Sequence, residues 1–108
     1  MEFKAVKQNK ATIISDGTID LAIAGYLADA AGGDTVALFN LGVAYSTGSG
    51  GVECDFVEAH KWFNLAASRG HEEASWCRAD VSDEMTAREI AEAQRRARRW
   101  LSEERRAA

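Results

Sequence analysis

Apolar residues recur at three- and four-residue spacing along most of the chain, in segments of helical length separated by glycine-marked breaks. The breaks are Ser15-Asp16-Gly17, Gly32-Gly33, Gly48-Ser49-Gly50-Gly51 and Gly70. This pattern predicts five helices, beginning at about residues 18, 34, 55, 71 and 86, the first running to about Ala31 and the fourth to about Ser82. The chain has no proline, which favours helices. Residues 1–15 fit a strand, an extended arm or a frayed helix.

Polar residues stand where the predicted helices begin. Thr18 and Asp34 can each accept a hydrogen bond from a first-turn amide, and the pairs Asp55/Glu58 and Thr86/Glu89 have the capping-box spacing. Behind these caps the apolar positions form one stripe per helix. The stripes are Ile19, Ala22, Ile23, Tyr26 and Ala30; Ala37, Leu38, Leu41, Ala44 and Tyr45; Phe56, Ala59, Trp62, Phe63 and Ala66; and Ile90, Ala93, Ala97, Trp100 and Leu101.

The composition is that of one globular domain. The chain has 108 residues, of which 46% are hydrophobic and 28% charged, so a core is possible and intrinsic disorder is excluded. No apolar run reaches the roughly 18 residues of a membrane span, and the first ten residues lack the apolar core of a secretion signal. The two cysteines are therefore expected to be reduced thiols, and the protein is expected in the cytoplasm.

A comparison of the chain with itself reveals an internal repeat. A shift of 37 residues places Ala22 on Ala59, Tyr26 on Phe63, Ala30 on Ala67, Gly33 on Gly70 and Ala37 on Ala74. Small residues and one aromatic residue thus recur in a fixed order. A period of this length is typical of solenoids in which each helical hairpin buries its apolar face against the next.

The residues from 34 to 70 carry a resemblance to a known family. Ala37-Leu38-Phe39-Asn40-Leu41-Gly42-Val43-Ala44-Tyr45, Gly48, Gly51-Val52, Asp55, Ala59, Trp62-Phe63, Ala66-Ala67 and Gly70 resemble the Sel1-like repeat, a relative of the tetratricopeptide repeat. The likeness extends more loosely over 18–33 and 71–84. It departs at Arg78, where a leucine is expected, and at Gly25, where Trp62 would recur. Degenerate outer repeats are usual for terminal caps.

The repeat and the resemblance together predict an all-α fold, a short right-handed α/α solenoid of helical hairpins with a C-terminal capping helix. We expect residues 1–17 to form an N-terminal arm, 18–85 the Sel1-like repeats and 86–108 the capping helix. Gly42 is expected to allow close approach of Ala59, and Gly48 and Gly70 to end helices in left-handed turns. A structural role, without chemistry, is expected for Ala37, Leu41, Gly42, Tyr45, Gly48, Ala59, Phe63, Ala67 and Gly70.

The resemblance implies a non-enzymatic adaptor or scaffold that binds a protein or peptide in a concave groove. By analogy with related repeats, the first helix of each hairpin lines that groove. The matching positions are Val36, Phe39, Val43, Ser46, Glu73, Trp76, Asp80 and Asp83. The alternative is that Phe39 and Trp76 only pack against neighbouring helices.

Charge is distributed unevenly within the net charge of −4. Residues 1–10 carry +2, residues 11–85 carry −9 and residues 86–108 carry +3. An acidic groove predicts a partner with apolar and basic side chains. Arginines of the last helix could neutralise phosphates, but Glu89, Glu92, Glu103 and Glu104 are interleaved, and the acidic body would repel a polyanion. The spacing predicts three ion pairs there, Arg88–Glu92, Glu92–Arg96 and Arg99–Glu103. No nucleic-acid or membrane partner is expected.

Cofactor and catalytic interpretations find little support in the spacing. Cys54, His60, His71 and Cys77 are zinc-ligand types, but six-residue steps place successive ligands on different sides of a helix. We expect no metal, no cofactor and no disulfide between Cys54 and Cys77. A Cys and His nucleophilic pair would lack an orienting residue. The alternatives that stay open are a small hydrolase or β-lactam-binding protein, since some Sel1-like proteins are linked to β-lactam binding, and a self-associating subunit.

Overall fold

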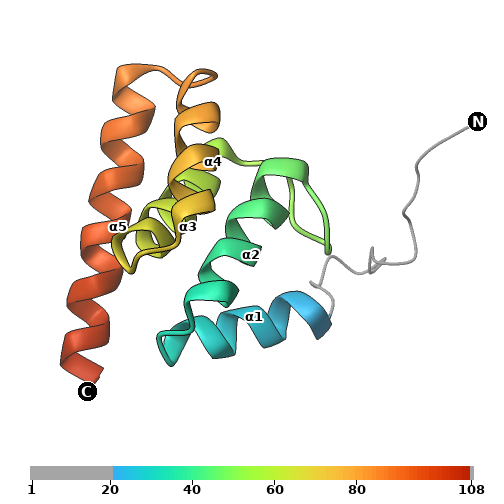
Figure 1. Ribbon diagram of the computed structural model, residues 1–108, viewed down its shortest axis with the longest axis vertical. Coiled ribbons are helices and arrows are strands. Elements are labelled where there is room, and N and C mark those ends of the chain that lie inside the picture. Colours follow the sequence, from blue (N-terminus) through green and yellow to red (C-terminus); the bar gives the residue numbers. More distant parts are fainter. Residues whose placement is uncertain (1–20, 108) are drawn as a thin grey trace, which may run out of the picture.

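The computed structural model describes residues 21–107, and over this range the chain forms five α-helices (Figure 1). They are α1 (Leu21–Ala31), α2 (Thr35–Thr47), α3 (Phe56–Ser68), α4 (Glu72–Ser82) and α5 (Ala87–Ala107). The all-helical prediction is confirmed, and neighbouring helices pack as in a helical repeat solenoid. The predictions for the arm over 1–17, the cap at Thr18 and the core residue Ile19 lie outside the described residues.

The helices begin where capping residues satisfy free backbone amides. Asp34 accepts a hydrogen bond from the amide of Ala37 at 3.1 Å, and Asp55 accepts one from Glu58 at 3.1 Å. Thr86 and Glu89 form the reciprocal capping box, with bonds of 2.8 and 3.1 Å. At α4 the cap is His71, whose Nδ1 accepts from the amide of Ala74 at 3.1 Å. This fixes Nδ1 of His71 as the unprotonated ring nitrogen.

The 37-residue period of the sequence is also a period of the structure. Helix α3 ends where a 37-residue shift of α1 predicts, and α4 begins 37 residues after α2. Gly33 and Gly70 occupy equivalent turns with φ of 91° and 95°. Both lie in the left-handed region, which glycine enters at little cost. The chain therefore repeats one local geometry, with Asp34 replaced by His71 as the cap.

Helix α3 is the centre of the fold. It packs against α2, α4 and α5, and it buries six side chains between residues 59 and 66. Those residues are Ala59, His60, Trp62, Phe63, Leu65 and Ala66. Helix α2 supplies the facing layer with Ala37, Leu38, Leu41 and Ala44, all at most 4% exposed, and α1 packs on the far side of α2. The core is thus built around the hairpin of α2 and α3.

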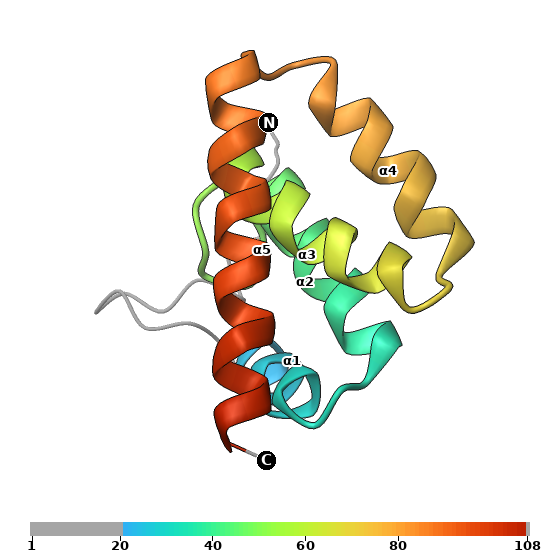
Figure 2. The same ribbon diagram turned by 90° about the vertical axis from the view of Figure 1, so that its left-hand side faces the viewer.

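The last helix packs mainly on α3 rather than on α4, its neighbour in the sequence. Figure 2 shows α4 and α5 diverging from the loop that joins them. Two small residues on α5, Ala93 and Ala97, are 0% and 3% exposed and allow this close approach. Trp62 of α3 meets Trp100 of α5 edge to face, with ring centroids 5.8 Å apart. Gly25 stands at the position in α1 that matches Trp62, and nothing lies within 4 Å of where its Cβ would be.

One detail of the predicted packing is wrong. The nearest atoms to the position of a Cβ on Gly42 belong to the ring of Phe63, with Cδ1 and Cε1 at 2.5 Å, and not to Ala59. The ring is 1% exposed, so it has little space to move aside. The reason is that Phe63, one turn beyond Ala59 on α3, projects its ring across the hairpin. Gly42 is therefore required by an aromatic ring and not by the approach of two small residues.

We expect opposite effects from the same substitution at two helical glycines. Gly42→Ala should lower the free energy of unfolding by about 1–3 kcal/mol, because the methyl group would overlap the Phe63 ring. Gly25→Ala should raise it by up to about 1 kcal/mol, since alanine favours helix and the site is open. Urea unfolding followed by circular dichroism measures both. Shifts of the same sign would contradict the account of Gly42.

Candidate functional site

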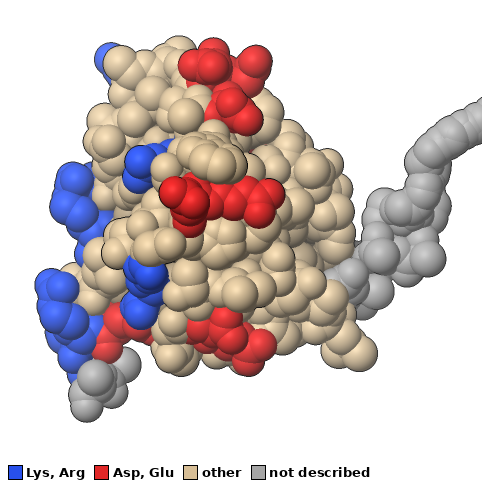
Figure 3. Space-filling model, in the orientation of Figure 1, with Lys and Arg blue, Asp and Glu red and all other residues tan. Residues whose placement is uncertain are grey.

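The outward side of α4 combines an exposed aromatic ring with carboxylates. Trp76 is 64% exposed, and Glu73, Asp80 and Asp83 are all exposed on the same side of the helix. Ala74 and Val81 hold the opposite side in the core. In Figure 3 acidic side chains lie in patches over the face that presents α4, whereas Lys and Arg lie mainly along the edge formed by α5. Helix α4 therefore offers an acidic surface around Trp76.

The predicted groove residues of α2 lie in different surroundings. Val36 is 58% exposed and Val43 is 37% exposed. Phe39 is partly buried, stacked on the His71 ring with centroids 4.4 Å apart and 5.7 Å from the ring of Phe63. Ser46 is also partly buried, and its hydroxyl donates to the carbonyl of Val43 at 2.9 Å.

Val43 is directed toward α1 rather than toward α4. It lines a hollow of about 250 Å³ between α1, α2 and the glycine-rich loop. The other lining residues are Ala22, Ile23, Tyr26, Asn40, Ala44, Ser49 and Gly50. Phe39 contacts His71, the cap at the start of α4. The structure thus brings Phe39 near the base of α4 and separates Val43 from it.

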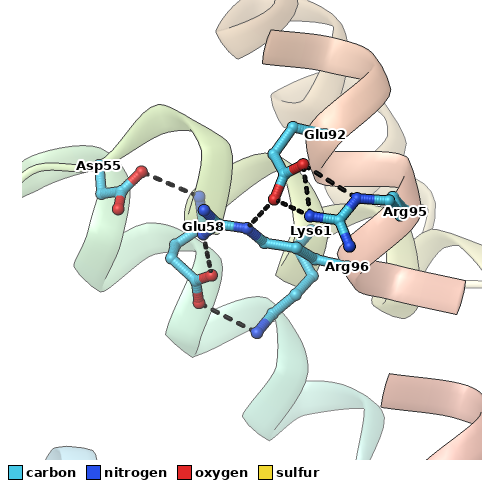
Figure 4. Close-up of polar contacts among 6 residues, drawn as sticks. All are labelled: Asp55, Glu58, Lys61, Glu92, Arg95 and Arg96. Carbon is cyan, nitrogen blue, oxygen red and sulfur yellow. Dashed lines mark hydrogen bonds and ion pairs between the residues drawn. The ribbon is translucent and has the colours of Figure 1, made fainter. Parts of the chain in front are cut away.

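A second hollow, of about 390 Å³, lies between α3 and α5 and is polar. Its lining residues are Glu58, Lys61, Glu92, Arg96, Arg99, Trp100 and Glu103. Arg96 joins the two helices, with Nη1 2.7 Å from Glu58 and Nε 2.8 Å from Glu92 (Figure 4). Hydrogen bonds from Arg95 and Arg96 lower the pKa of Glu92 to about 2. Burial alone would raise the pKa of Glu58, but Lys61 and Arg96 lower it overall.

Of the three ion pairs expected along α5, the structure confirms Glu92–Arg96. The expected pairs Arg88–Glu92 and Arg99–Glu103 are wrong: neither is among the ion pairs within residues 21–107. Glu92 instead forms an ion pair with Arg95, whose Nη2 lies 2.6 Å from its Oε1. Both carboxylate oxygens of Glu92 are then occupied, which leaves no acceptor for Arg88.

A buried polar group lies between α3 and α4. His60 is 3% exposed, and its Nδ1 has no hydrogen-bond partner in the structure. Burial lowers the pKa of His60, and the charge of Arg78 lowers it further. Arg78, which stands where the repeat calls for leucine, donates to the side-chain carbonyl of Asn64 at 2.6 Å. His60 is therefore held neutral beside a fixed guanidinium.

The two thiols are free and lie in different surroundings. Both cysteines are free; Cys54 is exposed and its Sγ lies 3.5 Å from the carbonyl oxygen of Ser46, while Cys77 is partly buried. Burial raises the pKa of Cys77, and Glu73 and Asp80 add to the rise. A raised pKa keeps the thiol protonated and less nucleophilic.

Neither a cluster of metal ligands nor a membrane-spanning helix occurs among residues 21–107. Among residues 21–107 no three His, Cys, Asp or Glu side chains are grouped to hold a metal ion. Over the same residues, no helix has the length and apolarity needed to cross a membrane.

Comparison with known proteins places the central hairpin in a family. The family model of the Sel1 repeat matches residues 35–71, which span α2, the glycine-rich loop and α3. The α2–α3 hairpin is a Sel1-like repeat. Neither the curated proteins nor the solved structures contain a match to it. Sel1 repeats generally mediate protein–protein interaction, so a protein partner is the general expectation for this chain.

Sequence reasoning missed the polar contacts that cross between helices of the Sel1 repeat and its neighbours. Glu58 and Arg96 are 38 residues apart, so no local spacing announces their pairing. Asn64 and Arg78 are 14 residues apart and lie on different helices, so helical spacing does not predict their contact either. The one available signal was the replacement of a repeat leucine by Arg78, because a charge at a core position must find a partner.

We expect the stability of this protein to depend on pH through His60. Its folded pKa lies below the ordinary 6.5, so the unfolded chain binds the proton more readily, and stability falls as the pH drops below about 6.5. The slope should reach at most about 1.4 kcal/mol per pH unit. Glu58 contributes only below its own ordinary pKa of 4.5.

Urea unfolding from about pH 7.5 to about pH 5.5 measures this slope against that of a His60→Gln variant. Glutamine keeps a polar group of similar size and has no proton to gain. The variant should show the smaller loss of stability on acidification. Equal losses in both proteins would show that the dependence arises elsewhere.

Proposed function

We propose that this chain is a non-enzymatic binding module, an adaptor or scaffold, that holds a protein or peptide on the outward surface of α4. The observation that carries the proposal is that the side chain of Trp76 is 64% exposed and is flanked along the helix by carboxylates. The exposed part of a tryptophan side chain does not stabilise the folded monomer by burial. At many interfaces, however, tryptophans contribute much of the binding energy. The family supports the same class of function, since Sel1 repeats generally bind proteins.

Charge defines the kind of partner. Glu73 and Asp80 flank Trp76 at one helical turn on either side, and Asp83 extends the acidic row. A partner with lysine or arginine beside apolar side chains would match this surface. The apolar contacts would supply most of the affinity, and the carboxylates would speed the encounter.

The predicted groove residues of α2 would play different roles in this binding. Phe39, stacked on His71 at the start of α4, would support the surface from below. Val36 and Ser46 lie near the two ends of α2 and would meet only a partner long enough to cross from one helix to the other. Catalysis at this surface is disfavoured because the nearby thiol of Cys77 has a raised pKa.

We expect peptides selected from a displayed library on the wild-type protein to combine apolar residues with lysine or arginine. Trp76→Ala should weaken their binding by roughly tenfold or more, mainly through faster dissociation. Reversal of charge at Glu73 or Asp80 should slow association, and the effect should shrink as salt is added. Stopped-flow fluorescence at low and high ionic strength separates the two effects.

A matched control is Leu21→Ala, which removes an apolar side chain that is 89% exposed on α1, away from α4. It should leave both rate constants unchanged. Peptides that bind Trp76→Ala as tightly as the wild type, or that Leu21→Ala weakens equally, would contradict the proposal.

A further inference from the structure

Arginines dominate the outward face of α5. Six of its seven arginines are exposed on the side away from the core: Arg88, Arg95, Arg98, Arg99, Arg105 and Arg106. Their spacing places them on one side of the helix, opposite the buried Ala93 and Ala97. We call this set the arginine face. Arg96 is the exception, because it turns inward to Glu58.

The glutamates of α5 are engaged elsewhere. Glu89 closes the capping box with Thr86, and Glu92 binds Arg95 and Arg96. Glu104 lies 3.9 Å from Arg69, and Glu103 lines the hollow against α3. Arg98 and Arg105 make no hydrogen bond or ion pair with any other residue of the described chain. Apart from Arg95, the arginine face is therefore not neutralised by other described residues.

The same molecule offers the complementary surface on α4. Its exposed charged residues are all acidic, namely Glu72, Glu73, Asp80 and Asp83, with Glu84 following in the loop and Trp76 among them. The one basic residue of this helix, Arg78, points inward to Asn64. We call this set the acidic face. The outward surface of α4 is thus acidic, and that of α5 is dominated by arginines.

We propose that the acidic face of one copy binds the arginine face of a second copy. The inference rests on the proposed function, because it assigns an occupant to the surface around Trp76. Guanidinium groups pair with carboxylates and also stack on an indole ring, so arginines satisfy both kinds of group on α4. Their long alkyl stems add the apolar area that Trp76 would cover.

The arginine face is long enough to cover the acidic face. Both are single helices, so the contact is a helix laid against a helix. At about 1.5 Å per residue, the arginine face extends for about 27 Å from Arg88 to Arg106, longer than the roughly 16 Å of α4. The acidic face would be covered along its whole length.

The association should be weak and sensitive to salt. Exposed ion pairs contribute little individually, and one helix pair buries less than the area of a standard interface. A polyanion such as nucleic acid could also meet the arginine face, but the net charge of −4 opposes it, while the acidic face favours another copy of this chain.

Sedimentation of the full chain over a range of concentrations tests the proposal. The wild type should form dimers or larger assemblies at low ionic strength, and its association constant should fall by about tenfold or more at high ionic strength. A chain that stays monomeric at every concentration and salt level overturns the inference. Peptide binding that persists in such a monomer would leave the proposed function standing.

Charge reversal identifies the surfaces. Glu73→Lys with Asp80→Lys reverses the acidic face, and Arg98→Glu with Arg105→Glu reverses the arginine face. Each variant alone should stay monomeric, and their mixture should regain association. The two variants have formal net charges of 0 and −8, so general attraction between oppositely charged proteins would not account for recovery. Thermal melts check that both variants are folded.

Two further measurements test whether the copies meet at another surface and whether the arginine face binds nucleic acid instead. Leu21→Glu, on α1, should leave self-association unchanged. If this change abolishes association, or if the reversed variants associate as the wild type does, the copies meet elsewhere and the inference is overturned. A mixture that stays monomeric also overturns it. So does a wild type that stays monomeric while binding a DNA duplex that the Arg98/Arg105 variant does not bind.

Discussion

Every described helix except α1 is placed by contact with α3. Six of its thirteen residues are buried, and it touches α2, α4 and α5 on different sides. Such a helix cannot rotate or shift without opening one of three interfaces, because packed interiors leave little free volume. The Phe63 ring shows how tight the packing is, since it occupies the space where any other residue at position 42 would place its Cβ. The α2–α3 hairpin is therefore the rigid centre, which agrees with the Sel1 repeat match over 35–71.

The central position of α3 determines which side of α4 and α5 meets solvent. Each of these helices packs through small residues, Ala74 on α4 and Ala93 with Ala97 on α5. With these sides against the core, the acidic residues of α4 and the arginines of α5 are directed outward. The two inward exceptions, Arg78 and Arg96, both find polar partners on α3. The separation of charge on the surface is thus a consequence of how the core is packed.

The fold could be predicted from sequence to the extent that it depends on local signals. The caps at Asp34, Asp55 and Thr86, the stripes of apolar residues and the glycines in left-handed turns are all read within a few neighbouring positions. The neighbour of Gly42 was predicted incorrectly, because side-chain direction depends on how two helices cross. Contacts such as Glu58–Arg96 join residues far apart in sequence and have no periodic signature.

The candidate surface could be predicted only in part. The periodicity of α4 indicated that Trp76, Glu73 and Asp80 share one side of a helix, and the exposure of Trp76 distinguishes it from a core residue. The fate of Phe39 depended on His71, which lies 32 residues away and also caps α4. Whether an aromatic residue is buried or exposed depends on such neighbours in space, which the composition and local pattern of the sequence do not reveal.

Amide hydrogen exchange of the native chain tests the central role of α3 most directly. Among the described residues α3 is held by three helices, whereas α1 packs mainly on α2. The amides of α3 should therefore be the last to exchange, through global unfolding, while those of α1 exchange through local opening. The outward face of α4 should exchange faster than α3 as well. Protection in α1 equal to that in α3, or exchange of α3 before α2, would contradict the account.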